Sequence, residues 1–206
     1  MIAIVDYGMG NRRSVEKALA HVGAESVITR DPGEIRGADG IVLPGVGAFP
    51  EAMRNLTALG LDAPLRERAE AGVPLLGICL GMQLLFESST EHEGALGLGL
   101  LPGDVTVLDT RGERLPHIGW NLVTMRRPAR LTEGLGEAAA FYHVHSLACR
   151  PADEADVAGT GEYGGRFVSI VERGNVFGVQ FHPEKSSRDG LALLRNFAGV
   201  CASVAA

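Results

Sequence analysis

Cys79 is the residue whose neighbours best fit a nucleophile. It is the centre of Gly-Ile-Cys-Leu-Gly at residues 77–81, which follows an apolar run and precedes an amphipathic stretch. A nucleophile between two glycines at a strand-to-helix turn sits on a strained elbow, where the glycines allow close backbone packing. The free N–H groups and positive dipole end of a following helix favour the thiolate form. The alternative is a buried cysteine that acts as a small hydrophobic residue.

A base and a group to orient it are present in His182-Pro183-Glu184. This tripeptide directly follows the apolar run at residues 176–181, and Pro183 favours extended backbone at His182. In an extended chain, His182 and Glu184 point to the same side. The carboxylate can then orient the imidazole while the other ring nitrogen faces a thiolate, as in a nucleophile–histidine–acid triad. A surface turn with a solvated glutamate is the alternative interpretation.

The elements that must position these residues alternate in the first half of the chain. Apolar runs predict strands at residues 2–5, 26–29, 40–43 and 74–78, and apolar periodicity predicts helices at residues 12–22, 50–59, 61–71 and 81–88. Strands that alternate with helices indicate a parallel sheet covered on both faces. Cys79 and His182 each lie at the C-terminal end of a predicted strand, which is the edge where sites form in open α/β sheets.

The second half of the chain is richer in strands. We predict them at residues 105–108, 120–124, 141–146, 156–159, 167–171 and 176–181, with a hairpin turn at residues 173–175 and a closing helix at residues 191–200. No repeat or interdomain linker is evident. We therefore predict a single α/β domain over residues 1–206, with a mixed, mostly parallel sheet flanked by helices and a more antiparallel C-terminal half.

Composition narrows the classes of protein. The chain has 206 residues, 46% of them hydrophobic, and a net charge of −6. No basic stretch is long enough to follow nucleic-acid phosphates, so nucleic acid is not an expected partner. Three cysteines do not form a disulfide framework. The N-terminus lacks the features of a signal peptide, and the most apolar stretch, residues 73–86, is shorter than the about 20 residues of a membrane helix. We expect a cytoplasmic protein with no membrane partner.

Longer motifs around these residues resemble a known family. Gly-Ile-Cys-Leu-Gly-Met-Gln-Leu-Leu at residues 77–85 and Val-Gln-Phe-His-Pro-Glu at residues 179–184 resemble the class I (triad) glutamine amidotransferases. Three further segments are similar to those of the glutaminase subunits of imidazole glycerol phosphate synthase. They are Asp-Tyr-Gly-Met-Gly-Asn at residues 6–11, Leu-Pro-Gly-Val-Gly at residues 43–47 and Pro-His-Ile-Gly-Trp-Asn at residues 116–121.

The resemblance implies roles for individual residues. Cys79 would attack the carboxamide of L-glutamine, His182 would act as base and then acid, and Glu184 would orient His182. The oxyanion hole would come from the backbone N–H of Leu80 and from one in the loop at residues 44–47. Such donors are each worth roughly 3–4 kcal/mol in acyl transfer. The positions that match the oxyanion loop and glutamine pocket are Gly45, Val46, Gly47, Gln83, Glu91 and Ser146.

The resemblance also implies a partner. The family forms a heterodimer with a (βα)₈-barrel cyclase, through which ammonia passes to the nucleotide substrate. The products are imidazole glycerol phosphate, on the histidine pathway, and aminoimidazole carboxamide ribotide. Trp120 is the only tryptophan, and tryptophan is enriched among interface anchors. A lone tryptophan more often belongs to the core, but the family match of residues 117–121 favours the interface. The positions that match the subunit contact are Asn11, Arg114, His117, Gly119, Trp120, Asn121, Tyr142 and Lys185.

Some features differ from the family or point elsewhere. His143 stands where relatives often carry an aromatic residue, and Leu147 where they often carry Tyr. Gly8 and Gly10 suggest a dinucleotide fingerprint, but Arg13 occupies its third glycine position. His143 and His145 alternate as metal ligands on a strand can, but no nearby cysteine or carboxylate completes a set. We expect neither a metal nor a cofactor.

Two other functions remain open from the sequence. The first is another enzyme of the same fold, such as a glutaminase for a different synthase or a cysteine peptidase. Gln83 and Glu91 favour a free amino acid substrate over a peptide. The second is a non-enzymatic binding module with a degenerate elbow, in which Cys79 would show no unusual reactivity. We also expect low activity without the cyclase, because the two-glycine loop at residues 44–47 can change its peptide orientation at low cost.

Overall fold

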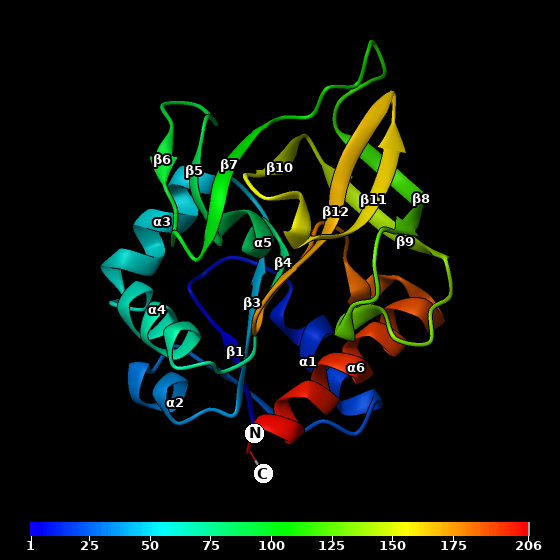
Figure 1. Cartoon of the computed structure of the whole chain (residues 1–206). Helices are drawn as coiled ribbons and strands as arrows, with labels where there is room; N and C mark the ends of the chain where they lie inside the picture. Colours follow the sequence, from blue (N-terminus) through cyan, green and yellow to red (C-terminus); the bar gives the residue numbers. More distant parts are fainter. Residues whose placement is uncertain (206) are drawn as a thin grey trace.

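The main sheet of the computed structural model, which describes residues 1–205, has nine strands in the order β2-β1-β3-β4-β13-β12-β11-β8-β9 (Figure 1). Its first five strands are parallel. In sheet order they are β2 (Ser26–Thr29), β1 (Ile2–Val5), β3 (Gly40–Gly45), β4 (Leu75–Cys79) and β13 (Val176–Val179). The C-terminal ends of β3, β4 and β13 therefore meet at one edge.

The other four strands are antiparallel to their neighbours. They are β12 (Gly165–Arg173), β11 (Val157–Tyr163), β8 (His117–Met125) and β9 (Ala138–His145). The predicted fold class is confirmed: a mixed sheet with a parallel first part, an antiparallel second part and flanking helices.

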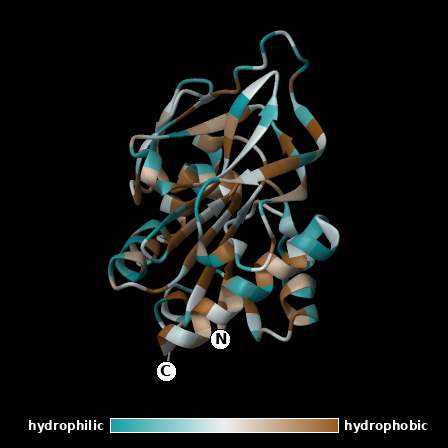
Figure 2. Cartoon of the chain, turned by 45° about the vertical axis from the view of Figure 1, so that its right-hand side comes forward, coloured by the Kyte–Doolittle hydropathy of each residue, from teal (hydrophilic) through white to brown (hydrophobic). Residues whose placement is uncertain are grey.

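Helices cover both faces of the parallel strands. On one face, α1 (Arg12–His21) and α6 (Ser187–Ala205) contribute Leu19 and Phe197 to a buried cluster. On the other face lie α2 (Pro32–Arg36), α3 (Phe49–Ala58), α4 (Asp62–Glu70) and α5 (Leu80–Leu84). Figure 2 shows the hydrophobic residues concentrated along the central strands and the helix sides that face them. Along the described residues, no helix combines the length and apolarity needed to span a membrane.

A second, four-stranded sheet was not predicted from the sequence. Its order is β10-β7-β5-β6. The strands are β10 (Leu147–Pro151), β7 (Leu101–Val107), β5 (Phe86–Ser89) and β6 (Ala95–Leu96). Three 3₁₀ turns, Arg130–Thr132, Glu154–Asp156 and Pro183–Lys185, complete the elements described.

The second sheet overturns the prediction of a helix over residues 81–88, because α5 ends at Leu84 and β5 begins at Phe86. The carbonyl of Leu84 accepts from the backbone N–H of Leu98, and that of Leu85 from those of Leu100 and Leu101, with N···O distances of 2.8–3.0 Å. A continuing helix would use those carbonyls itself. A distant segment therefore ends the helix. The unpredicted helix α2 has a local signal, since Asp31 caps it and Pro32 begins it.

Candidate active site

Cys79 ends β4 on a strained turn. Its backbone has φ 56° and ψ −112°, a region that costs a non-glycine residue about 1–3 kcal/mol. A Cβ on Gly81 would lie 1.7 Å from Leu43 O, and one on Gly77 would lie 2.5 Å from Gly81 O. Both glycines are therefore required for the close approach of β3, β4 and α5. Because α5 has only five residues, the dipole support expected from a longer helix is reduced.

His182 and Glu184 form a buried pair at the end of β13. The Nδ1 atom of His182 lies 3.0 Å from Oε1 of Glu184, and the two side chains are 5% and 1% exposed. Burial acts to lower the pKa of His182, but its contacts with Cys79 and Glu184 outweigh burial and raise that pKa to about 9. The arrangement favours an imidazolium at neutral pH. Oε2 of Glu184 is buried and has no hydrogen-bond partner among residues 1–205, so within that range the carboxylate pairs with His182 through Oε1.

The sulfur of Cys79 is placed between groups from two strands. Cys79 Sγ lies 3.8 Å from the backbone O of Val144 on β9 and 3.8 Å from Nε2 of Gln180, which directly follows β13. Gln180 is fully buried and was not predicted as a site residue. The nucleophile thus contacts the parallel and antiparallel parts of the main sheet at once.

A cavity of about 290 Å³ opens at Cys79. It gathers nine of the residues singled out from the sequence, which come from the ends of β3, β4 and β13, from α5 and from loops. They are Val46, Gly47, Cys79, Leu80, Gln83, Glu91, Ser146, His182 and Lys185. Glu184, which pairs with His182, and Gly45 are not among the residues that line it. The cavity is of a size for a small polar substrate.

The loop predicted to supply an oxyanion donor is held at its first half and open at its second. The hydroxyl of Tyr7 donates to Pro44 O at 2.8 Å, and a Cβ on Gly45 would lie 2.5 Å from that hydroxyl oxygen. Val46 is exposed, and Gly47 has a φ of +105° that favours glycine. The backbone N–H of Leu80 belongs to the first turn of α5, where helical N–H groups lack partners within the helix.

Glu91 connects the cavity to the helix that follows this loop. Its Oε2 accepts from the backbone N–H of Phe49, the first residue of α3, at 2.6 Å. The loop between β5 and β6 therefore places Glu91 at the cavity, which the local sequence alone did not show. Gln83 is buried on α5, and its Nε2 donates to Oε1 of Gln180 at 3.1 Å. A carboxylate and an amide thus face the same space.

Four further residues line the cavity: Pro116, Val144, His145 and Leu147. His145 Nδ1 donates to Leu147 O at 2.8 Å, so its Nε2 accepts from Nδ1 of His117 at 3.0 Å. Burial lowers the pKa of His145 to about 4, which agrees with this neutral form. His143, Val144 and His145 follow one another along β9, so Val144 points to the face opposite the two histidines.

Four of the residues that match the family's subunit contact belong to β8, and they lie on its two opposite faces. Trp120 is 56% exposed, and its ring lies 6.2 Å, edge to face, from that of Tyr142 on β9. Ile118 and Leu122 flank it on the same face and are equally exposed. Val144 pairs with Ile118 and also lines the cavity, so this apolar face adjoins the candidate site. We call the exposed side chains of Ile118, Trp120 and Leu122, together with the half-buried Tyr142, the β8–β9 face.

The side chain of His117 lies outside the β8–β9 face. It is buried and stacks on Tyr163 at 4.2 Å between ring centroids. Asn121 also points inward, and its Nδ2 donates to Glu162 O at 2.8 Å. Side chains alternate along a strand, so positions 117, 119 and 121 share the inner face of β8 and, of these four residues, only Trp120 lies on the outer face. Asn11, Arg114 and Lys185 are exposed elsewhere.

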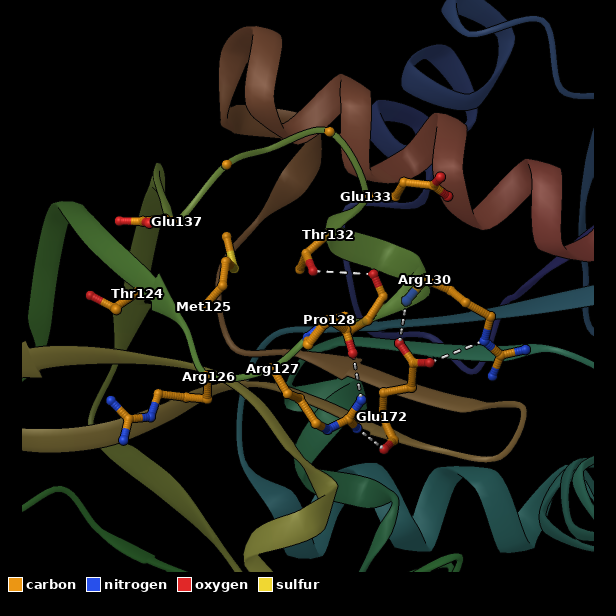
Figure 3. Close-up of a pocket in the computed structure, with 13 residues that line it drawn as sticks. Thr124, Met125, Arg126, Arg127, Pro128, Arg130, Thr132, Glu133, Glu137 and Glu172 are labelled. Carbon is orange, nitrogen blue, oxygen red and sulfur yellow. Dashed lines mark hydrogen bonds and ion pairs between the residues drawn. The ribbon is translucent and has the colours of Figure 1, made fainter.

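A larger cavity of about 850 Å³ lies away from Cys79, beside the loop after β8 (Figure 3). Three of its charged side chains, those of Arg127, Arg130 and Glu172, are paired within the protein. Glu172 accepts from Nε and the backbone N–H of Arg130, and the guanidinium of Arg127 donates to the carbonyls of Ala155, Pro128 and Glu172. Figure 3 shows Arg126 pointing away from the space. This cavity contains no nucleophile–base pair. Within residues 1–205, no group of three or more His, Cys, Asp or Glu is arranged for a metal ion.

Comparison with known proteins agrees with this geometry. Residues 3–200 match the family described as glutamine amidotransferase class-I, and the chain belongs to that family. Its full-length relatives include a protein of Moorella thermoacetica, 56% identical over 95% of this chain and 93% of the relative, and one of Bacillus cereus (strain G9842), 52% identical over 97% and 95%. Both are named imidazole glycerol phosphate synthase subunit HisH. Within the class I family, the chain belongs with these HisH subunits.

Solved structures show the same fold at lower identity. A glutamine amidotransferase superposes with a TM-score of 0.75 at 23% identity, covering 98% of this chain and 100% of the other. The structure of PurLQS from Thermotoga maritima gives a TM-score of 0.74 at 20% identity, covering 97% of each chain.

Proposed function

We propose that this chain is one glutamine amidotransferase domain that hydrolyses L-glutamine to glutamate and ammonia through Cys79, His182 and Glu184. The observation that carries the proposal is the cavity at Cys79. Cys79 stands there on a strained elbow, beside the side chains of Gln83 and Glu91. The imidazole of His182, whose pKa is raised, reaches the same cavity and pairs with the carboxylate of Glu184.

The geometry supports the following steps. The Cys79 thiolate attacks the carboxamide carbon, and the oxygen of the tetrahedral intermediate is stabilised by the backbone N–H of Leu80 and one from Val46 or Gly47. The imidazolium of His182 gives its proton to the amide nitrogen, the C–N bond breaks, and ammonia leaves a thioester. His182 then takes a proton from water, the hydroxide attacks the thioester, and glutamate leaves as the thiolate returns.

Substrate recognition is assigned to the far end of the cavity. The α-ammonium group of glutamine can donate to the carboxylate of Glu91 and to the side-chain oxygen of Gln83. The α-carboxylate then binds beside Ser146. Glu91 also holds the first N–H of α3, so the same carboxylate connects substrate to the loop that precedes α3. Gly45 and Gly47 shape that loop. Its exposed second half supports low glutaminase activity until a partner covers it.

The proposed partner is the (βα)₈-barrel cyclase of imidazole glycerol phosphate synthase. The β8–β9 face is a contiguous exposed apolar surface, and large exposed patches of this kind mark binding sites. It adjoins the cavity through Val144, so ammonia released at Cys79 emerges beside the docked subunit. There it would yield imidazole glycerol phosphate and aminoimidazole carboxamide ribotide in histidine biosynthesis. Lys185 and Asn11, which are exposed outside this surface, are further candidate polar contacts with the cyclase.

The test is to mix the chain with a cyclase subunit and its nucleotide, and to measure ammonia and glutamine-dependent product. Cys79→Ala is expected to abolish both while leaving cyclase binding intact. Cys201→Ala is the matched control, because it also removes a buried thiol, but far from the cavity, and it is expected to retain activity. Full glutaminase activity in Cys79→Ala contradicts the proposal. Cleavage of peptides without glutamine turnover would indicate a peptidase instead.

A further inference from the structure

Gln180 is a buried polar residue that the mechanism above leaves unused. It directly follows β13, its backbone N–H donates to Ser169 O at 2.9 Å, and its side chain is fully enclosed. It lies two residues before His182 in extended backbone, so both side chains project to the same side of the strand. Gln180 and His182 therefore reach the sulfur of Cys79 from one strand.

The Gln180 amide joins two other site residues. Its Oε1 accepts from Nε2 of Gln83 at 3.1 Å, and its Nε2 faces Cys79 Sγ at 3.8 Å. Burying an amide is costly unless it is hydrogen-bonded, and both ends of this amide are used inside the site. The thiol of Cys79 has an acceptor of its own in Val144 O, at 3.8 Å. The sulfur lone pairs are therefore free to accept from Gln180.

This chain of amides has two possible directions, and only one of them provides a donor to the sulfur. In the direction described, Gln83 donates to Gln180 and Gln180 donates to sulfur, which suits a thiolate because a thiolate only accepts. In the reverse direction, a neutral thiol donates to Gln180 Oε1, and Gln180 Nε2 donates to Gln83 Oε1. A donor-only ligand group such as an ammonium needs Gln83 Oε1 for itself. It thereby commits Gln83 Nε2 to Gln180 and selects the first direction.

We propose that Gln180 is a positioning residue that donates to the Cys79 sulfur and couples it, through Gln83, to the ammonium of the bound amino acid. This inference rests on the proposed function, since it assumes that Gln83 Oε1 receives that ammonium. Substrate binding then favours the thiolate at the moment it is needed. Hydrogen bonds to charged groups are stronger than those between neutral groups, which gives the arrangement its effect.

The test measures alkylation of Cys79 by chloroacetamide as a function of pH, in the complex with the cyclase. Chloroacetamide reports the thiolate without requiring glutamine turnover. In Gln180→Met, which keeps the length and loses the donor, we expect alkylation at pH 7 to fall about 10-fold and the profile to move to higher pH. In Gln180→Glu the move should be larger, because a carboxylate cannot donate and repels the thiolate. For glutamine hydrolysis, kcat should fall more than KM rises.

Ser169→Ala is the matched control. Ser169 lies on β12, beside β13, and its buried hydroxyl is 2.9 Å from Nε2 of His143. The substitution removes this donor and so perturbs packing beside Gln180 without touching Cys79. Its alkylation profile should match the wild type. Profiles for Gln180→Met and Gln180→Glu that superimpose on the wild type would overturn the inference. Failure of the wild type to hydrolyse glutamine would instead reject the proposed function, and the alkylation profiles distinguish the two results.

Discussion

The parallel and antiparallel parts of the main sheet are built under opposite constraints. Where β3, β4 and β13 end, backbone is crowded against backbone, and glycines at positions 45, 77 and 81 have no room for a Cβ. On β8 and β9, large apolar side chains stand in open solvent, and Gly119 has nothing within 4 Å of its missing Cβ. The first region holds a strained Cys79 fixed, and the second presents a surface.

The comparison shows how one sheet serves both purposes. A nucleophile must be held within a fraction of an ångström by its supporting shell, whereas a docking surface needs exposure and little internal support. Val144 is where the two regions meet, because its carbonyl contacts Cys79 while its strand carries Tyr142 on the β8–β9 face. Mutations in the two regions should therefore have different consequences.

The largest effect is expected in the crowded region. Gly81→Ala places a Cβ 1.7 Å from Leu43 O, so we expect a loss of at least about 3 kcal/mol in unfolding free energy and loss of glutaminase activity. Chemical denaturation measures the first quantity. Gly199→Ala in α6, where nothing lies within 4 Å, is the control and should raise stability by up to about 1 kcal/mol. Equal denaturation midpoints for Gly81→Ala and the wild type would contradict the comparison.

On the exposed face, binding should change and stability should not. Trp120→Ala is expected to weaken cyclase binding by about 2 kcal/mol, as is typical of an interface anchor. Its free energy of unfolding should stay within about 0.5 kcal/mol of the wild type, because the side chain is more than half exposed. Calorimetric titration with the cyclase checks this. Leu96→Ala removes an exposed leucine on β6 and should leave binding unchanged, so equal losses in the two variants would reject the β8–β9 face.

Glu91 tests whether recognition and chemistry are separable within the site. In Glu91→Gln the amide oxygen can still accept from Phe49 N–H, but the charge opposite the ammonium is lost. We expect KM for glutamine to rise about 10-fold with kcat retained. Glu91→Ala also releases the start of α3 and should lower kcat as well. Identical kinetics for the two substitutions would show that the contact with Phe49 has no role in the reaction.

The pH dependence gives the most specific test of the pair at His182. Its pKa is about 9, and the reaction needs the imidazolium as an acid, so kcat/KM should fall as pH rises through about 9. Glu184→Gln removes one group that raises the pKa of His182. The fall of the residual activity at alkaline pH should therefore begin at least about one pH unit lower than in the wild type. An unchanged alkaline fall would dissociate Glu184 from His182. Because the folded-state pKa is raised above 6.5, the pair's contribution to stability is complete below pH 6.5 and disappears as pH rises through about 9.

The sequence predicted the parts of the molecule that local patterns determine. Short apolar runs located the parallel strands, and the placement of Cys79 and His182 at strand ends followed from them. The helix predicted beyond Leu84 was wrong because backbone N–H groups of residues 98, 100 and 101 donate to the carbonyls of Leu84 and Leu85, a contact between distant segments. The inward orientation of His117 follows from the register of β8 against β9, which period-2 alternation alone leaves undetermined.

Gln180 was visible in the sequence as part of the motif around His182, but nothing local showed that its amide would reach both Gln83 and Cys79. That arrangement depends on β13 lying beside β4 in parallel register, with Val179 opposite Ile78. The roles proposed for the triad, the glutamine pocket and the β8–β9 face stay predictions until they are measured.

The most direct measurement is covalent labelling of the complex with 6-diazo-5-oxo-norleucine, a reactive glutamine analogue, followed by peptide mapping by mass spectrometry. The chain offers three buried thiols, Cys79, Cys149 and Cys201, for comparison in one experiment. The account predicts one adduct, on the peptide that contains Cys79, and its suppression by excess glutamine. Labelling spread over the three cysteines, or no labelling of Cys79 in a complex that binds the cyclase, would contradict the claim that this turn holds the nucleophile of a glutaminase.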